Sequence, residues 1–143
     1  MTDREHHEIQ VWSPEGDLLT QFGSSAGLFR PTGIAYDQVG DQIVVSDKDN
    51  HRIVIFSCCS GQLLKTFGSR GHRDGQFLYP WGVAVSPDGT RLAVADSRNH
   101  RVQLFSMKDG AFLAKYTCPD PKKFKLQFDY PRGLSFDLTG MYV

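Results

Sequence analysis

The chain repeats a ten-residue phrase, and a repeat at a fixed period constrains the fold more than any other feature of a sequence. DKDNHRIVIF, at residues 47–56, returns as DSRNHRVQLF at residues 96–105. The flanking stretches return at the same offset: RPTGIAYD (30–37) as YPWGVAVS (79–86), and GQLLKTFG (61–68) as GAFLAKYT (110–117). The fold must therefore be built from stacked copies of one unit.

The repeat divides the chain into two complete copies with a half copy at each end. DREHHEIQVW near the N-terminus matches the back half of the unit, and YPRGLSFD near the C-terminus matches its opening. We expect residues 1–23 to form the second half of a unit, 30–68 and 79–117 two complete units, 118–129 a basic loop between units, and 130–143 the first half of a further unit. Both ends fall at nearly the same point of the repeat, so we expect a piece of a longer array.

Each copy has the pattern of four short strands. GIAYD, QIVVSD, HRIVIF and QLLKTFG are short apolar runs in the first copy, and turn clusters such as SPDGT and MKDG separate the runs of the second. No stretch has the period of a helix. Four antiparallel strands in a unit of about 40–50 residues are typical of a β-propeller blade. We therefore expect an all-β fold, a partial β-propeller of about three four-stranded antiparallel blades, with apolar blade faces exposed at the two ends.

Composition sets the class of protein. No apolar run approaches the roughly 20 residues of a membrane span, and no N-terminal stretch resembles a signal peptide. The three cysteines, of which Cys58 and Cys59 are adjacent, do not form a disulfide framework or have the spacing of a zinc site. A reducing compartment is indicated, and we expect a cytoplasmic protein without membrane partner, metal or cofactor.

Three motifs together resemble a known family. Pro-x-Gly-(Val/Ile)-Ala, then a strand ending in Asp, then Asn-His-Arg-(Ile/Val)-x-(Ile/Leu)-Phe is similar to the NHL repeat, carried here by Asn50-His51-Arg52 and Asn99-His100-Arg101. The linker GSRGHRDGQFLYPWGVAV (68–85) resembles TRIM-NHL proteins, and in particular their Wech-like subgroup, whose propellers bind RNA stem-loops. In the first half copy, His6-His7-Glu8 departs from the motif.

The resemblance implies a six-bladed parent propeller that binds mRNA, with stem-loops as one candidate shape, in a cytoplasmic post-transcriptional repressor that also enters P-body-type granules. It further implies a RING-type E3 ubiquitin ligase activity of the parent, which this chain alone would lack. Protein partners are the alternative, and no small-molecule substrate is implied.

Charge is unevenly distributed although the formal net charge is zero. In a propeller, the loops between blades and the loops joining second to third strands share one face. Sorted in this way, bases outnumber acids on that face, and acids outnumber bases on the opposite one. Aromatic residues accompany the bases, a combination that suits RNA because cations neutralise phosphate and rings stack on bases. The candidate RNA-binding residues are Arg30, Lys48, Tyr79, Trp81, Arg98, Lys122, Lys123, Lys125, Tyr130 and Arg132.

Several of the most prominent residues have a simpler structural interpretation. The Asn-His-Arg triplets recur once per blade, as architecture does, so we expect them to shape turns and bond between loops rather than bind metal or ligand. We expect Asp3, Asp47 and Asp96 to accept backbone N–H bonds within their own turns, and the Pro-x-Gly steps to be turn formers.

The residue between Pro and Gly varies among Thr32, Trp81 and Arg132. For Trp81, an exposed stacking platform and a packing residue are equally favoured. Arg132 is favoured as a phosphate contact.

Three functions compete. An RNA-binding face of a TRIM-NHL repressor is favoured by the resemblance and by the uneven charge. A module that recruits proteins to a ubiquitin ligase is the alternative, because polarised charge serves protein partners equally well. An enzyme ranks last, since no His and carboxylate cluster with a nucleophile–base pairing is evident, and we expect no catalytic residue.

Overall fold

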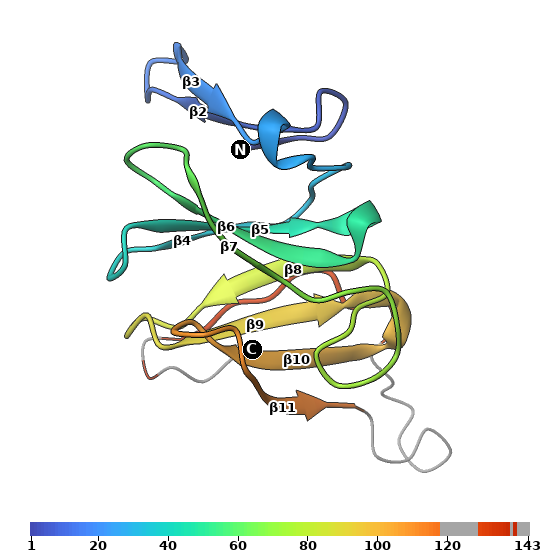
Figure 1. Ribbon diagram of the computed structural model, residues 1–143. Coiled ribbons are helices and arrows are strands. Elements are labelled where there is room, and N and C mark those ends of the chain that lie inside the picture. Colours follow the sequence, from blue (N-terminus) through green and yellow to red (C-terminus); the bar gives the residue numbers. More distant parts are fainter. Residues whose placement is uncertain (118–128, 138, 140–143) are drawn as a thin grey trace.

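The computed structural model describes residues 1–117, 129–137 and 139, and it consists of strands joined by turns. Three antiparallel sheets lie one above another (Figure 1). The first contains β1 (Thr2–Asp3), β2 (Glu8–Trp12) and β3 (Leu18–Phe22). The second contains β4 (Ile34–Asp37), β5 (Gln42–Asp47), β6 (Arg52–Ser57) and β7 (Leu63–Phe67). The third contains β8 (Pro80–Val85), β9 (Arg91–Asp96), β10 (Arg101–Ser106) and β11 (Phe112–Tyr116).

The two four-stranded sheets are simple meanders, with strand orders β4-β5-β6-β7 and β8-β9-β10-β11. Register is the same in both: Asp47 pairs with Arg52 at the end of the β5–β6 hairpin, and Asp96 pairs with Arg101 at the end of the β9–β10 hairpin. One-turn 3₁₀ helices close these two hairpins, at Lys48–Asn50 and Ser97–Asn99, and a third lies at Ser24–Ala26. The expected all-β architecture of four-stranded antiparallel blades is thus confirmed.

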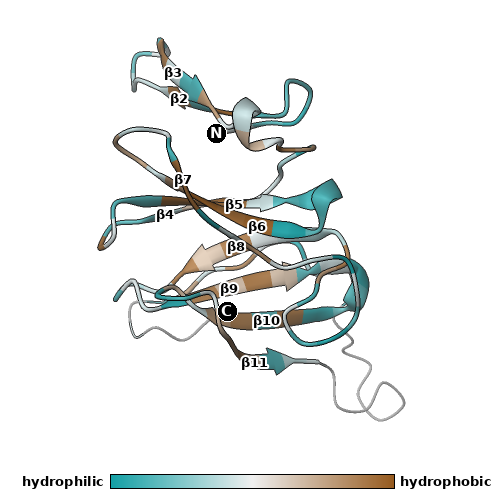
Figure 2. Ribbon diagram, in the orientation of Figure 1, coloured by the Kyte–Doolittle hydropathy of each residue, from teal (hydrophilic) through white to brown (hydrophobic). Residues whose placement is uncertain are grey.

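The cores lie between the sheets, because the central strands bury both faces. Successive residues of a strand point to opposite sides. On β5, Ile43 and Val45 therefore pack toward the first sheet with Ile9 and Phe56, while Val44 packs toward the third sheet. This explains the unbroken apolar runs in the sequence, and Figure 2 shows the apolar colour concentrated in the strand centres, with polar residues at the turns.

At the first two Pro-x-Gly steps, the backbone of the next unit lies very close to the glycine. A Cβ added to Gly33 would lie 2.2 Å from the backbone oxygen of Trp81, and one added to Gly82 would lie 1.9 Å from the backbone oxygen of Arg132. These glycines are structural, as expected, but for a different reason. Their missing side chain lets the next unit approach, whereas a turn was expected.

Exposure of apolar faces differs between the two ends of the stack. Trp12, Leu18 and Leu19 are exposed on the first sheet. On the third sheet, Ala93 and Leu104 belong to a buried cluster, and Leu134 and Phe136 pack against it. The expectation of exposed blade faces therefore holds for the first sheet and is wrong for this face of the third, because the segment after Pro131 covers it. Within the described part of the chain, no helix has the length and apolar character needed to cross a membrane.

Candidate functional site

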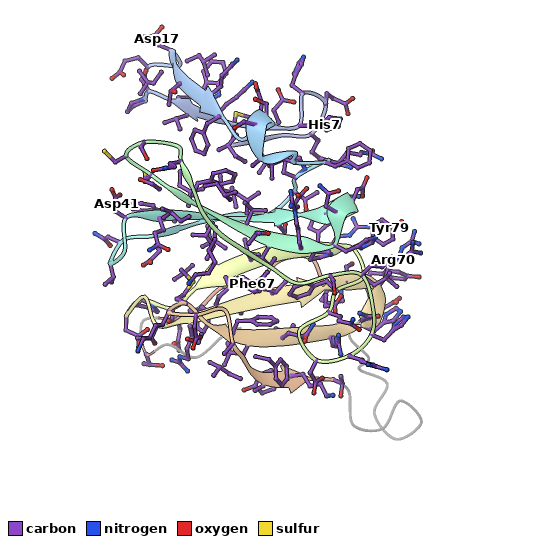
Figure 3. The ribbon with its side chains drawn as sticks, in the orientation of Figure 1. His7, Asp17, Asp41, Phe67, Arg70 and Tyr79 are labelled. Atoms are coloured by element: carbon purple, nitrogen blue, oxygen red, sulfur yellow. The ribbon has the colours of Figure 1, made fainter. Side chains whose placement is uncertain are left out.

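A pocket of about 530 Å³ opens where the β5–β6 and β9–β10 turns meet the openings of successive units. Figure 3 shows Tyr79, Arg70 and His7 at this end of the sheets and Asp17 and Asp41 at the other. The pocket is lined by Arg30, Lys48, Asp49, Tyr79, Trp81, Ser97, Arg98, Tyr130 and Arg132.

Seven of the ten candidate residues named from the sequence line this one pocket: Arg30, Lys48, Tyr79, Trp81, Arg98, Tyr130 and Arg132. They come from two hairpin turns and three unit openings, far apart in sequence. The other three candidates, Lys122, Lys123 and Lys125, lie outside the described residues, as does most of the expected basic loop at 118–129.

The residue that precedes each Pro of the Pro-x-Gly steps has an unusual backbone conformation. Arg30, Tyr79 and Tyr130 have positive φ angles, of 51°, 55° and 49°, which are uncommon for residues other than glycine. A histidine of the preceding unit accepts the N–H of each: His7 Nδ1 accepts from Arg30 at 3.2 Å and His51 Nδ1 from Tyr79 at 3.0 Å. The third bond, from Tyr130 N–H to His100 Nδ1, is longer, at 3.5 Å. The same arrangement recurs between units, so each opening is held in place by its neighbour.

The histidines also pack against the pocket aromatics. The rings of His51 and Tyr79 meet edge to face at a centroid distance of 4.5 Å, and those of His100 and Tyr130 at 4.8 Å. Burial, followed by the nearby charge of Arg70, lowers the pKa of His51 below its usual value. His51 is therefore held neutral, which is the state that can accept the Tyr79 N–H. Among the described residues, no group of three His, Cys, Asp or Glu side chains could hold a metal ion.

The Asn-His-Arg triplets form a scaffold, as the sequence indicated. Asn99 donates to the carbonyl of Gly71 and to the carboxylate of Asp96, while Arg101 donates through Nε to Asp96 at 2.7 Å. Arg101 also donates to the backbone carbonyls of His72, Arg73 and Gln76. The triplet thereby ties down the loop that leads from β7 to the pocket.

The strand-end aspartates behave differently from the expectation. Asp3 does accept the N–H groups of Glu5 and His6 in its own turn. Asp47 and Asp96 accept instead from Phe29 N–H and Leu78 N–H, each at 2.7 Å, in the loop that precedes their unit. The expectation is wrong for these two because their fully buried carboxylates point across to that loop, and each also pairs with an arginine, Arg52 or Arg101.

The first unit replaces the triplet with other side chains. His6 takes the place of the asparagine, and its Nδ1 lies 2.8 Å from Asp3 Oδ2. Glu8 stands where the arginine would be, and Gln10 donates through Nε2 to both Asp3 and Glu8. The role of the arginine is thus absent from this turn, while His7 keeps the position and the inter-unit bond of His51.

Cations lie over two aromatic rings of the pocket, those of Tyr79 and Trp81. The guanidinium of Arg98 lies 4.6 Å from the ring centroid of Tyr79, and that of Arg132 lies 4.6 Å from the ring of Trp81. The Lys48 ammonium lies 5.2 Å and 6.0 Å from the same two rings. Trp81 is half-buried and belongs to none of the apolar clusters of the described residues, so its ring faces the pocket rather than the core.

One acid interrupts this cationic surface. Asp49 pairs with Lys48, and its other oxygen lies 3.7 Å from Arg30. Lys48 itself is buried, whereas Arg30, Arg98 and Arg132 are exposed. Asp49 and Ser97 were not among the residues predicted from the sequence, although both occupy the same hairpin turns as Lys48 and Arg98. Their turn positions were the signal that could have identified them.

Comparison with known proteins agrees with this fold. Residues 30–56 and 77–105 match the family described as NHL repeat. Protein brain tumor of Drosophila melanogaster is 44% identical over 61 residues, which are 42% of this chain and 6% of that relative.

Two solved structures share the architecture at low identity. Kuenenia stuttgartiensis hydrazine synthase superimposes with a TM-score of 0.61 at 17% identity, covering 77% of this chain and 27% of that one. Dihydro-heme d1 dehydrogenase NirN, in complex with DHE, gives a TM-score of 0.62 at 12% identity, covering 85% and 24%. This chain therefore spans about a quarter of those structures and a small part of the fly relative. The two matched segments are thus similar to NHL repeats, and the chain has the fold of part of a β-propeller.

Proposed function

We propose that the pocket face binds RNA, and that the chain is the RNA-binding part of a TRIM-NHL post-transcriptional repressor. The observation that carries the proposal is the convergence of four basic and three aromatic side chains on one pocket. Basic side chains neutralise phosphate, while tyrosine, tryptophan and arginine planes stack on unpaired bases. The volume of about 530 Å³ falls within the range of roughly 300–1,000 Å³ typical of small-molecule sites, which is compatible with a nucleotide.

The remaining features of the proposal follow from the family resemblance. We propose that the chain forms part of a six-bladed ring, with unit boundaries at 30–68 and 79–117, in a cytoplasmic protein that enters P-body-type granules. We also propose a Wech-like preference for structured RNA. The ubiquitin ligase activity belongs, in this proposal, to a RING domain elsewhere in the parent protein.

The test is binding of the 143-residue chain to a pool of structured and unstructured RNAs at two salt concentrations. We expect selective enrichment of one RNA class that weakens as salt rises, because phosphate contacts release counterions. Arg98→Ala and Arg132→Ala should each weaken binding roughly tenfold, the effect of losing about 1.4 kcal/mol. Arg91→Ala is the matched control, since Arg91 lies at the opposite end of β9 from the turn that lines the pocket. Binding that ignores salt and both pocket variants would overturn the proposal.

A protein-interaction module is the second candidate, and one observation favours it. Arg98 and Arg132 already cover the faces of Tyr79 and Trp81, so the groups presented to a partner are guanidinium edges rather than bare rings. Such edges suit carboxylates of an acidic peptide, which would make the face a substrate-recruiting surface for a ubiquitin ligase. No RNA enrichment at low salt, together with capture of an acidic peptide that Arg98→Ala weakens, would place this candidate first.

A further inference from the structure

Three cations from three different units surround a single ring, that of Trp81 in a fourth unit. The charged carbons of Arg132 and Arg4 lie 4.6 Å and 5.7 Å from the centroid of the Trp81 ring, and the Lys48 nitrogen lies 6.0 Å from it. Arg4 and Lys48 hold equivalent places, each directly after a strand-end aspartate. Arg132 comes from the opening of the last unit, so the cluster cannot form within any one blade.

Within the part of the chain that the structure describes, Arg4 contacts the Trp81 ring, but no acid pairs with it. Its Nε atom is buried and has no hydrogen-bond partner among the described residues. The neighbouring acid Asp3 is engaged elsewhere, by His6 and Gln10. Lys48, in contrast, is paired with Asp49. An arginine whose buried N–H is left unpaired loses its hydration without compensation, which is unfavourable unless a ligand supplies an acceptor.

The ring alone cannot neutralise this charge. A cation–π contact stabilises by about 0.5–1 kcal/mol at exposed sites, and each cation beside the ring repels the other two. An anion among the three would remove the repulsion, and a phosphate has enough acceptor oxygens to bond several donors at once. The adjacent pocket is lined by two of the three cations, so the cluster has access to a ligand bound there.

We propose that Arg4, Lys48 and Arg132, gathered around Trp81, form a phosphate subsite. This inference deepens the proposed RNA function and rests on it: the subsite holds a phosphate ester, while Tyr79, Arg98 and Arg30 contact the neighbouring nucleotide. It assigns a binding role to Arg4, which does not line the pocket. In this proposal, the Trp81 ring packs against Arg4 and Arg132 and holds them in place. Because Arg132 covers the ring, the ring is not free to stack on a base.

The test uses tryptophan emission of the 143-residue chain. Trp12 and Trp81 are the two tryptophans, and Trp12→Phe leaves Trp81 as the reporter. The probes are tripolyphosphate, a base-free ribose-phosphate oligomer, and a single-stranded RNA of the same length, each titrated at several salt concentrations. Arg4→Gln removes the charge of interest. Arg91→Gln is the control at the far end of β9, and circular dichroism verifies that each variant keeps its sheet content.

We expect all three probes to change Trp81 emission, and Arg4→Gln to weaken each of them by at least threefold. For the RNA and the base-free oligomer, the slope of log affinity against log salt should fall by about 0.7, the loss of one phosphate contact on a single strand. Arg91→Gln should change neither. Comparing the affinities of the base-free oligomer and of tripolyphosphate distinguishes the two possible natural ligands. Tighter binding of the oligomer indicates a nucleic-acid backbone phosphate, and tighter binding of tripolyphosphate indicates a free polyanion.

The failures of the two proposals are distinguishable. RNA binding that Arg4→Gln leaves unchanged in affinity and salt slope overturns the phosphate subsite but leaves the RNA function standing. Absence of RNA binding by the unmodified chain overturns the RNA function. If tripolyphosphate still binds in that case and Arg4→Gln abolishes its binding, the subsite stands as a site for a non-nucleic polyanion.

Discussion

The Nδ1 atom of His51 accepts a hydrogen bond from the backbone N–H of Tyr79 at 3.0 Å, and so joins one blade to the opening of the next. The bond places a pocket aromatic by means of a residue of the repeat motif. It requires neutral imidazole, and burial lowers the pKa of His51 accordingly. Scaffold and candidate site are therefore coupled through one titratable group.

This coupling predicts a pH-dependent stability. The folded-state pKa of His51 lies below the unfolded value of about 6.5, so the unfolded chain binds the proton first. The stabilisation is present above about pH 6.5 and is lost as the pH falls through that value toward the folded pKa. The midpoint of urea unfolding should be lower at about pH 5.5 than at about pH 7.5. Arg70 and Lys48 reinforce the shift, and Asp49 and Asp96 oppose it.

His51→Asn is the control for this prediction, because asparagine tolerates the positive φ of 56° at this position but does not titrate. The variant should show a smaller change in midpoint between the two pH values. His6, whose pKa is raised by its bond to Asp3, contributes the opposite sign in both proteins and so cancels in the comparison. An equal pH dependence of variant and parent would show that His51 is not the titrating group.

The glycine of the second Pro-x-Gly should not tolerate alanine. The new Cβ of Gly82→Ala would meet the Arg132 backbone oxygen at 1.9 Å, and backbone cannot move aside as a flexible side chain can. We expect the free energy of unfolding to fall by about 1–3 kcal/mol or more. Gly133→Ala is a matched control in the third copy of the motif, because nothing described lies within 4 Å of its added Cβ.

Gly133→Ala should change stability by less than about 0.5 kcal/mol, as surface substitutions usually do. Both values come from denaturant unfolding monitored by circular dichroism. If the two substitutions changed stability equally, the close approach of two units would not be the reason that Gly82 cannot be replaced. The conformational entropy of glycine would then explain both effects.

Much of the fold could be predicted from the sequence, because each strand and turn of the repeat occurs in two complete copies whose patterns agree. The period, the strand-like runs and the turn clusters locate β4 to β11 within a residue or two. The acceptor role of Asp47 could not be predicted in the same way. Its donor, the N–H of Phe29, lies 18 residues earlier, in a loop whose path depends on how the sheets pack.

The part of the candidate site that could be predicted from the sequence is the set of residues whose loops lie on the same face of the fold. Assigning loops to faces brings Arg30, Lys48 and Tyr79 together without knowledge of any distance. The stacking of Arg132 on Trp81 was not predictable, because it follows from the close approach at Gly82. Arg4 and Asp49 were not predicted as site residues, because the net charge of a face does not show which of its side chains lie together. The equivalence of Arg4 and Lys48 in the repeat is the sequence signal for Arg4.

The buried ion pair of the second complete unit should be essential for stability. Asp96 is fully buried and accepts from Leu78 N–H, Asn99, Arg101 and Gln103. Asp96→Asn leaves Arg101, which is only 5% exposed, without its buried counter-charge, and the remaining acid, Asp74, is half-exposed and lies 3.8 Å from Arg101 Nη1. Breaking one side of a buried pair typically costs about 3–5 kcal/mol.

Asp3→Asn is the matched control, because Asp3 holds the same repeat position in a more exposed turn, where its partner His6 is largely solvated. Solvent screens an exposed pair, so this variant should be only mildly destabilised. Thermal unfolding of both variants tests the difference. Similar losses would indicate that the backbone bonds to the aspartate, rather than its charge, hold the turn.

The single acid of the pocket lining should weaken the binding of polyanions, so that its removal strengthens it. Asp49 pairs with Lys48 and lies near Arg30, and it is the one carboxylate among the described residues that line the pocket. Asp49→Asn frees both cations and removes a like charge that repels phosphate. We expect affinity for single-stranded RNA to rise about threefold or more at low salt, with the gain shrinking as salt screens the charges.

Asp17→Asn makes the same change of charge in the β2–β3 turn, at the end of the sheets opposite the pocket (Figure 3). If overall charge alone governed binding, the two variants would gain equally, because their net charges are identical. A gain confined to Asp49→Asn locates the polyanion at the pocket. A loss of affinity in Asp49→Asn would instead assign the carboxylate an attractive role, as an acceptor for the N–H groups of a base, and would make Asp49 a determinant of base preference.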